Sequence, residues 1–171
     1  IITEVSALAV ADFLTDKGAD VRIKWPNDIY VRDRKICGML IENSLRGDEV
    51  ATSIVGIGIN LNQRDFPAEL ANPTSLAIAT GKEIGPKEAL EDFLPFFLMR
   101  LEMSLTPEGR AEMRNDYLDI LYRKDKPSPY RDNVTGEEFT GTIKGISDIG
   151  ELLAEMPDKS IKSFSFKEIG Y

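Results

Sequence analysis

The sequence has no histidine and only one cysteine, Cys37, among its 171 residues. The absence of histidine excludes Ser-His-Asp and Cys-His catalytic arrangements within the chain. Zinc sites are not expected either, because thiolate and imidazole ligands are too few. A lone cysteine forms no disulfide framework, so we expect a reducing, cytoplasmic setting. We interpret Cys37, which follows Ile36 in a β-rich run, as a small core residue rather than a nucleophile.

The sequence also lacks a long apolar run. None approaches the about 20 residues that cross a bilayer, and Ile1–Ala11 has neither the basic region nor the cleavage signal of an export peptide. We therefore expect no membrane segment. The formal net charge of −8 argues against duplex nucleic acid as the main partner of this chain, because that partner requires a cationic surface.

One short region departs from the acidic character of the chain. Residues 22–35 have a local balance of +3, whereas all other residues sum to −11. A cationic stretch in an acidic chain suits a site for a phosphate or a carboxylate. The alternative is a solvated hairpin that carries Lys and Arg.

Hydrophobic periodicity predicts a helix and then an antiparallel meander. Apolar residues recur at helical spacing over Thr3–Lys17, and Gly18 ends this amphipathic helix. Turn signals of the types Pro-Asn-Asp, Asp-Arg and Gly-Asp then separate four β-rich runs. These predicted strands are Val21–Trp25, Ile29–Val31, Lys35–Glu42 and Val50–Leu61.

The next part of the chain is predicted to be helical. After a loop over Asn62–Pro73, Thr74 or Ser75 caps a short helix that ends at Gly81. A long helix opens at Gly85-Pro86, with a kink expected at Pro95, and a second runs from Pro107 to about Tyr122, so the two form a hairpin. The long helix has one broad apolar stripe made of Ala89, Leu90, Phe93, Leu94, Phe97, Leu98, Leu101 and Leu105.

The amino-acid composition of the sequence changes after Arg123. A linker of the form Lys-Asp-Lys-Pro-Ser-Pro leads into short β-rich runs over 138–146, 151–155 and 160–169, which are punctuated by glycine. We therefore predict two domains, residues 1–123 and a small all-β module over residues 124–171.

Two glycines mark the fourth predicted strand. The two-residue period of a strand puts Gly56, Gly58 and Asn60 on one face, opposite an apolar face. Glycine weakens a strand, so something approaches the backbone closely there, either a ligand or another element of the fold. Lys24 and Lys35 are placed where both ammonium groups can point toward this bare face, which suits a carboxylate that becomes an acyl phosphate.

Three segments in order resemble the biotin protein ligase family: Lys24-Trp25-Pro26-Asn27-Asp28, Lys35–Glu42 and Gly56–Asn60. The glycine-punctuated C-terminal runs are similar to the small SH3-like barrel of that family. The resemblance implies an α+β fold with a mixed, largely antiparallel sheet and flanking helices, akin to class II aminoacyl-tRNA synthetases. Residues 1–123 would form part of the catalytic domain and residues 124–171 the SH3-like domain.

The resemblance also implies an activity. Family members use ATP, with Mg²⁺, to convert biotin into biotinyl-5'-AMP and then pass biotin to a lysine of a biotin carboxyl carrier protein, such as that of acetyl-CoA carboxylase. The chain itself would hold no resident metal. An exposed sheet edge would pair with the carrier or with a second copy in a homodimer. By position, Lys35 and Lys24 match catalytic residues; Lys35, Gly38, Met39, Gly56 and Gly58 match the biotin site; and Lys24, Asn27 and Asn60 match the nucleotide side.

The sequence departs from the family in one respect. The arginine-glycine loop that covers the family's active site has no match in these residues, and neither do its upstream contacts to biotin. We therefore expect a partial chain; the DNA-binding domain that some family members carry would also lie upstream. Three alternatives are a lipoate or other acyl-protein ligase of the same fold, a non-catalytic biotin-binding sensor or scaffold, and a β-module that binds peptides.

Overall fold

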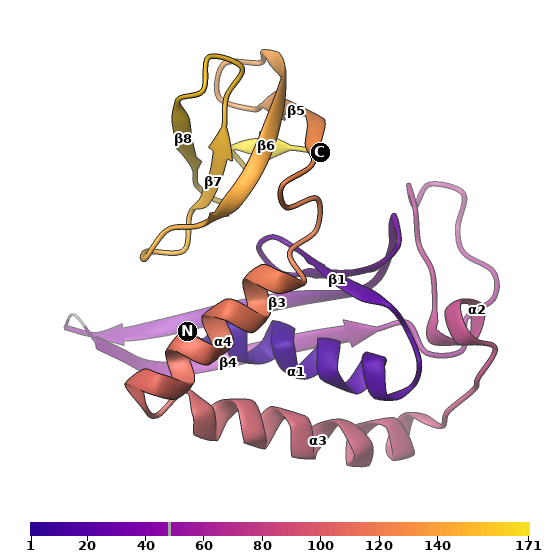
Figure 1. The fold of residues 1–171 in the computed structure, drawn as a ribbon. Helices are drawn as coiled ribbons and strands as arrows, with labels where there is room; N and C mark the ends of the chain where they lie inside the picture. The colour runs from indigo at the N-terminus through magenta and orange to yellow at the C-terminus, as the bar shows by residue number, and fades with distance from the viewer. Residues whose placement is uncertain (48) are drawn as a thin grey trace. The chain divides into compact units, whose positions relative to one another are not determined.

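The computed structural model describes residues 1–47 and 49–171. The chain divides into two units, Ile1–Ile120 and Leu121–Tyr171 (Figure 1). The boundary lies between residues 120 and 121, three residues before the predicted boundary between 123 and 124. The two units are described separately.

A four-stranded antiparallel sheet forms the centre of the first unit. Its strands are β1 (Val21–Lys24), β2 (Asp28–Val31), β3 (Arg34–Arg46) and β4 (Glu49–Ile59), in the order β1-β2-β3-β4. The predicted meander is confirmed. Strand β3 runs past the predicted end at Glu42, so β3 and β4 make a long hairpin; Asp48 of the predicted Gly-Asp turn lies outside the described residues.

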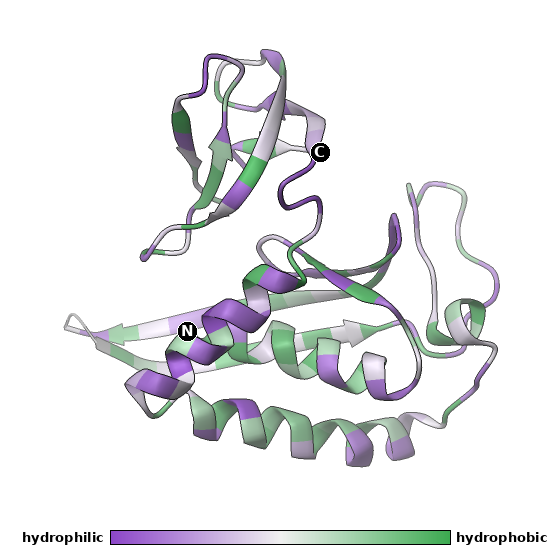
Figure 2. Ribbon diagram, viewed as in Figure 1, coloured by the Kyte–Doolittle hydropathy of each residue, from purple (hydrophilic) through white to green (hydrophobic). Residues whose placement is uncertain are grey.

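Helix α1 (Ile2–Asp16) confirms the predicted first helix, but its environment differs from the prediction. Ten of its residues are buried, among them Val5, Leu8, Phe13 and even Glu4. The helix lies between the sheet and the other helices of the unit, in contact with β1 and β2 on one side and with α3 and α4 on the other (Figures 1 and 2). It is therefore a core helix rather than an amphipathic one.

Three further helices begin where the sequence predicts, and the last of them ends at Asp119 rather than near Tyr122. Helix α2 (Leu76–Thr80) begins at Ser75, whose hydroxyl accepts a hydrogen bond from the Ile78 N–H, and ends at Gly81 in the left-handed conformation. Helix α3 (Pro86–Met103) continues through Pro95. Helix α4 (Pro107–Asp119) is capped by Thr106 and packs against α3, so the predicted hairpin is confirmed.

Only part of the predicted apolar stripe of α3 is buried. Ala89 and Phe93 are buried, and the Phe93 ring meets Phe13 of α1 edge to face. Leu90 is 56% exposed and Leu98 60% exposed. Because α3 meets the rest of the unit along one side, a stripe as broad as the predicted one leaves its outer half in contact with solvent.

A buried cation ties three helices together. Arg100 of α3 is 7% exposed, and its guanidinium binds both carboxylate oxygens of Asp12 in α1, at 2.7 and 3.0 Å. The same group also donates to Asp116 of α4. Hydrogen bonds to Asp12 and Asp116 raise the pKa of Arg100. The guanidinium is thus paired on two sides and fixes how α1, α3 and α4 pack.

The second unit is a five-stranded antiparallel sheet in the order β8-β7-β6-β5-β9. Its core contains Ile143, Leu152 and Phe164, each at most 1% exposed. The run 160–169, predicted as one strand, is two. The strands are β5 (Pro127–Asp132), β6 (Glu138–Ile146), β7 (Leu152–Glu155), β8 (Ile161–Phe164) and β9 (Ile169–Gly170).

The predicted linker was wrong at its end, since Pro127 and Pro129 belong to β5. Strand β9 pairs only with Arg131 and Asp132, so the first half of β5 has a partner strand on one side alone, that of β6. Proline lacks an N–H and is tolerated in such an edge position. The proline-rich composition of this segment therefore marks a sheet edge.

Candidate functional site

One row of residues crosses the sheet of the first unit. Lys24 is paired with Asp28, Asp28 with Gly38, and Gly38 with Gly58. Residues directly opposite each other in antiparallel strands share a face. The next row toward the hairpin tip pairs Leu40 with Gly56. A charged end and a glycine floor thus lie side by side on one face of the sheet.

The Lys35 ammonium lies above this floor. Its Nζ is 2.7 Å from Oδ1 of Asp28, and a Cβ added at Gly38 would lie 3.0 Å from the same Nζ. The Lys35 side chain is 42% exposed and that of Asp28 is 24% exposed. An ammonium has three donors, and Asp28 takes one of them. The group keeps donors for a negatively charged ligand.

A cavity of about 230 Å³ opens beside the Lys35 ammonium. It brings together Lys35, Gly38, Gly58 and Asn60, four of the residues singled out in the sequence. The other residues that line it are Cys37, Leu70, Ala71, Asn72 and Pro73.

The segment that follows β4 forms one wall of this cavity. Backbone bonds fix it to β3: the Lys35 N–H donates to the Asn72 carbonyl, and the Thr74 N–H donates to the Lys35 carbonyl, both at 2.8 Å. The sequence predicts a loop here and gives no signal for this role. The contact joins residues almost 40 positions apart, so no local pattern can show it.

The glycine floor is open. A Cβ added at Gly58 would meet only the Gly38 carbonyl, at 3.7 Å, and one at Gly56 only Leu40, at 3.8 Å or more. Among the described residues, no helix or further strand packs over these glycines. Of the two interpretations of the glycines, close packing by another element and close approach of a ligand, the geometry of the described residues favours the ligand.

Two predicted residues contribute to the fold near the site rather than to the cavity wall. The Asn27 carboxamide donates to the Met39 carbonyl, and the Met39 N–H donates to the Asn27 carbonyl, so the turn is held to β3. Met39 is 5% exposed and lies on the opposite face from Gly38. The Met39 side chain therefore points away from the glycine floor.

The remaining polar residues have defined partners. Lys24 Nζ lies 3.2 Å from the Tyr30 hydroxyl and 5.1 Å from the centre of its ring. The Asn60 carboxamide nitrogen donates to the Thr74 carbonyl, at 3.0 Å, so its oxygen is the atom left for a ligand. Asp28, the last residue of the segment Lys24-Trp25-Pro26-Asn27-Asp28, pairs with Lys35.

Cys37 is the core residue that the sequence predicts. It is 1% exposed, and burial, together with the Asp28 carboxylate, raises the pKa of its thiol to about 12. Such a thiol is protonated at neutral pH and is a poor nucleophile.

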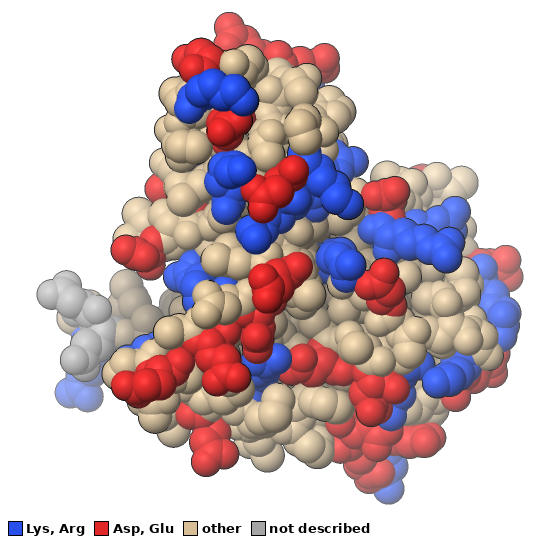
Figure 3. All heavy atoms as spheres, viewed as in Figure 1, with Lys and Arg blue, Asp and Glu red and all other residues tan. Residues whose placement is uncertain are grey.

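The described residues set two further limits. They include no group of three or more His, Cys, Asp or Glu side chains that could hold a metal ion. None of their helices combines the length and the apolar character that crossing a membrane requires. On the face of the first unit shown in Figure 3, acidic and basic side chains are interspersed.

Comparison with known proteins agrees with this geometry. Residues 1–60, which contain α1 and all four strands of the first sheet, match the model of the Biotin/lipoate A/B protein ligase family. Over these residues the chain is similar to this family. The match ends at Asn60, the last residue of the glycine-containing segment.

Members of the family resemble the chain well beyond residue 60. The Bifunctional ligase/repressor BirA of Bacillus subtilis is 33% identical over 168 residues, which are 96% of this chain and 51% of that protein. The Biotin--[acetyl-CoA-carboxylase] ligase of Paracoccus denitrificans is 33% identical over 160 residues, or 90% of this chain and 65% of that protein. The chain thus spans about half the length of the first relative.

A solved structure of the family shares the fold. The biotin protein ligase from Aquifex aeolicus in complex with biotin and ATP superposes with a TM-score of 0.77 at 28% identity, over 98% of this chain and 69% of that chain. The family fold, a mixed α+β arrangement with antiparallel sheets, is therefore present, as the sequence predicts.

Proposed function

We propose that this chain is part of an ATP-dependent biotin protein ligase, which forms biotinyl-5'-AMP and transfers biotin to a lysine of a carrier protein. The observation that carries the proposal is the Lys35 ammonium, held above an open glycine floor by Asp28. The names of the relatives, two of which are ligases and one of which binds biotin and ATP, support the same substrates.

Lys35 would act on both chemical steps. In the first, a biotin carboxylate oxygen forms a bond to the α-phosphorus of ATP, and pyrophosphate leaves with the electron pair of the broken P–O bond. In the second, the lysine amine of the carrier attacks the acyl carbon and loses a proton, and AMP leaves with the electron pair of the broken C–O bond. Both steps concentrate negative charge beside the acyl group, and a positioned ammonium stabilises such charge most where it develops.

The glycines would form the biotin floor. Gly38, Gly56 and Gly58 present backbone without side chains on the open face, which lets a flat ring system approach the strands. The backbone of Met39 is already bonded to Asn27, so we assign Met39 a supporting role behind this floor.

The nucleotide would lie toward Asn60 and Lys24. The Asn60 carboxamide is fixed through its nitrogen, which leaves its oxygen to accept from an adenine amino group or a ribose hydroxyl. Lys24 supplies a second cation at the end of the row of residues that crosses the sheet. Asn27 holds the turn that joins β1 to β2. Mg²⁺ would come with ATP and neutralise charge on its phosphates.

Larger partners belong to the same proposal. A carrier domain would present its lysine to the open face, and the free edge of β4 would pair with the carrier or with a second copy of the chain. The unit Leu121–Tyr171 is proposed to be the SH3-like domain of the family.

The deciding experiment measures pyrophosphate release from ATP by the protein as its gene encodes it. We expect release to require biotin, and labelled biotin to appear on a carrier protein added afterwards. The description of the matched family also names lipoate, so lipoate is the matched control. Release that depends on lipoate instead would favour a lipoate ligase, and biotin binding without pyrophosphate release would indicate a sensor; either result contradicts the proposal.

A further inference from the structure

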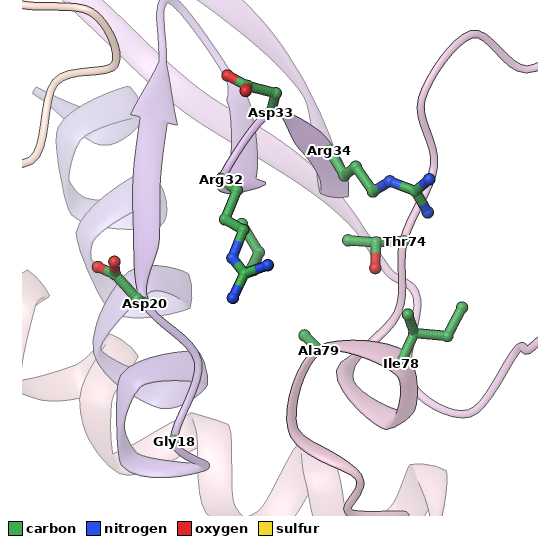
Figure 4. A pocket seen from close by; sticks show the side chains of 9 residues that line it. Gly18, Asp20, Arg32, Asp33, Arg34, Thr74, Ile78 and Ala79 are labelled. Atoms are coloured by element: carbon green, nitrogen blue, oxygen red, sulfur yellow. The ribbon is translucent and has the colours of Figure 1, made fainter.

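A second hollow lies away from the glycine floor. Its volume is about 710 Å³, and it is enclosed by three segments: the turn between α1 and β1, the turn between β2 and β3, and helix α2 (Figure 4). The segment 72–74 separates it from the cavity at Lys35, since Asn72 and Pro73 line that cavity and Thr74 lines this hollow. None of the roles proposed above uses it.

Two arginine side chains line this hollow. Arg32 and Arg34 come from the β2–β3 turn and line the space, and Figure 4 shows the Arg32 side chain extending into the gap between the α1–β1 turn and α2. Within residues 1–47 and 49–171, neither forms an ion pair or a side-chain hydrogen bond. Arg32 also adopts a left-handed backbone conformation, with φ of 56°, which non-glycine residues seldom take.

The acidic residues nearby do not pair with the two arginines. Asp20 is bonded to Arg22 at 2.6 Å, and the Asp33 carboxylate points out of the hollow in Figure 4. A third cation stands at the rim, because Lys82 Nζ donates to the Lys17 carbonyl at 3.1 Å next to Gly18. The formal charges of the lining residues thus balance, two arginines against two aspartates, but among the described residues neither aspartate pairs with Arg32 or Arg34.

A neutral donor completes the set. Thr74 lines the hollow and is 2% exposed, and its hydroxyl forms no hydrogen bond among the described residues. Its oxygen is not one of the buried polar atoms of those residues that lack a partner, so it reaches the open space of the hollow. The exposed side chain of Ile78 and the neighbouring Ala79 add an apolar wall. Two free guanidiniums, an unpaired hydroxyl and an apolar wall fit an oxyanion attached to a small organic body.

We propose that this hollow is an oxyanion-binding site, which holds the phosphate or carboxylate group of a small molecule through Arg32, Arg34 and Thr74. The proposal does not depend on the ligase function. It differs from the Lys35 site in its residues, in its position beyond segment 72–74, and in using guanidinium forks rather than an ammonium.

The test is an NMR titration of the arginine side-chain N–H signals with inorganic phosphate, glycerol 2-phosphate and acetate in parallel. We expect saturable shifts at Arg32 and Arg34, with a Kd on the order of a few mM for at least one of these anions. Whichever binds tightest identifies the source of the oxyanion. Arg32→Gln and Arg34→Gln should each weaken binding about tenfold, the usual size of a lost charge-assisted hydrogen bond.

Two matched variants locate the site. Arg110→Gln removes an exposed guanidinium on α4, bonded to the Ser104 carbonyl, and should leave binding unchanged. Lys35→Ala should also leave it unchanged, so failure here is separable from failure of the ligase proposal. Equal binding by the Arg32 and Arg34 variants, loss of binding only in Lys35→Ala, or shifts caused only by a glutamate-rich peptide would each overturn the proposal.

Discussion

Two cations of the first unit are both bound by carboxylates, yet their surroundings are opposite. Arg100 is 7% exposed and is paired with Asp12 and Asp116. Among the described residues Lys35 has one carboxylate partner, Asp28, and its side chain is 42% exposed above glycines. The first cation has its donors directed at the protein, whereas the second keeps donors for something else.

The difference teaches how to separate a structural ion pair from a functional one. A buried charge that is paired on several sides is costly to disturb, because its partners lose their compensation. An exposed pair contributes little to stability, about 0–1 kcal/mol. Substitution of Lys35 should therefore act on activity, and substitution of Arg100 on stability. Measurements of activity and stability on substituted proteins can contradict this distinction.

Lys35→Ala should have the largest effect, on the rate of adenylate formation. Loss of one group that stabilises developing negative charge costs roughly 10²–10³-fold in rate, so we expect that loss in biotin-dependent pyrophosphate release, with the midpoint of thermal unfolding nearly unchanged. The matched control is Lys144→Ala, because Lys144 is also 42% exposed and also lies 2.7 Å from one carboxylate, that of Asp125. Normal turnover by Lys35→Ala, or a comparable loss in Lys144→Ala, would contradict the assignment.

Arg100→Met should come next, with an effect on stability. It leaves Asp12 and Asp116 without their shared partner, and because these carboxylates are 25% and 40% exposed, water offsets part of the cost. We expect a loss of about 2–3 kcal/mol in the free energy of unfolding, measured with urea.

Lys87→Met is the control for Arg100 on the same helix. Lys87 is 89% exposed, and its ion pair with Glu91 is 3.7 Å long, so its removal should change the free energy of unfolding by less than about 0.5 kcal/mol. If both variants of α3 lost the same stability, the distinction between the buried and the exposed pair would fail.

Much of the fold could be predicted because its signals are local. The meander follows from short β-rich runs between turn residues, and the predicted cap at Ser75 lies where its side chain accepts from the nearby Ile78 N–H. The burial of α1 was missed because the helices that cover it come about 80 residues later in the chain. The exposed half of the α3 stripe was missed for the same reason.

The site was predicted less completely than the fold. The Gly56 and Gly58 face follows from the two-residue period of β4. The Lys35–Asp28 pair does not follow from spacing, because an irregularity between Ile29 and Tyr30 shifts the register of β2 against β3. The cavity wall at Asn72 depends on backbone hydrogen bonds to β3, a strand that is distant in the sequence. The spacing of residue types in the sequence cannot predict such a bond.

Gly38→Ala should have a smaller effect than Lys35→Ala, and a more specific one. The added Cβ would lie 3.0 Å from both Cε and Nζ of Lys35, so the ammonium has to shift by a few tenths of an ångström while the backbone stays in place. Misplacement of a catalytic group lowers mainly the rate of the chemical step, and we expect the rate at saturating biotin to fall about tenfold.

Gly56→Ala is the comparison, because its added Cβ would lie no closer than 3.8 Å to any other atom. That variant should raise the KM for biotin and leave the saturated rate near normal. Equal saturated rates for both variants would show that the exact position of the Lys35 ammonium does not matter for the chemical step. The contrast between Lys35 as a functional cation and Arg100 as a structural one would then lose its support.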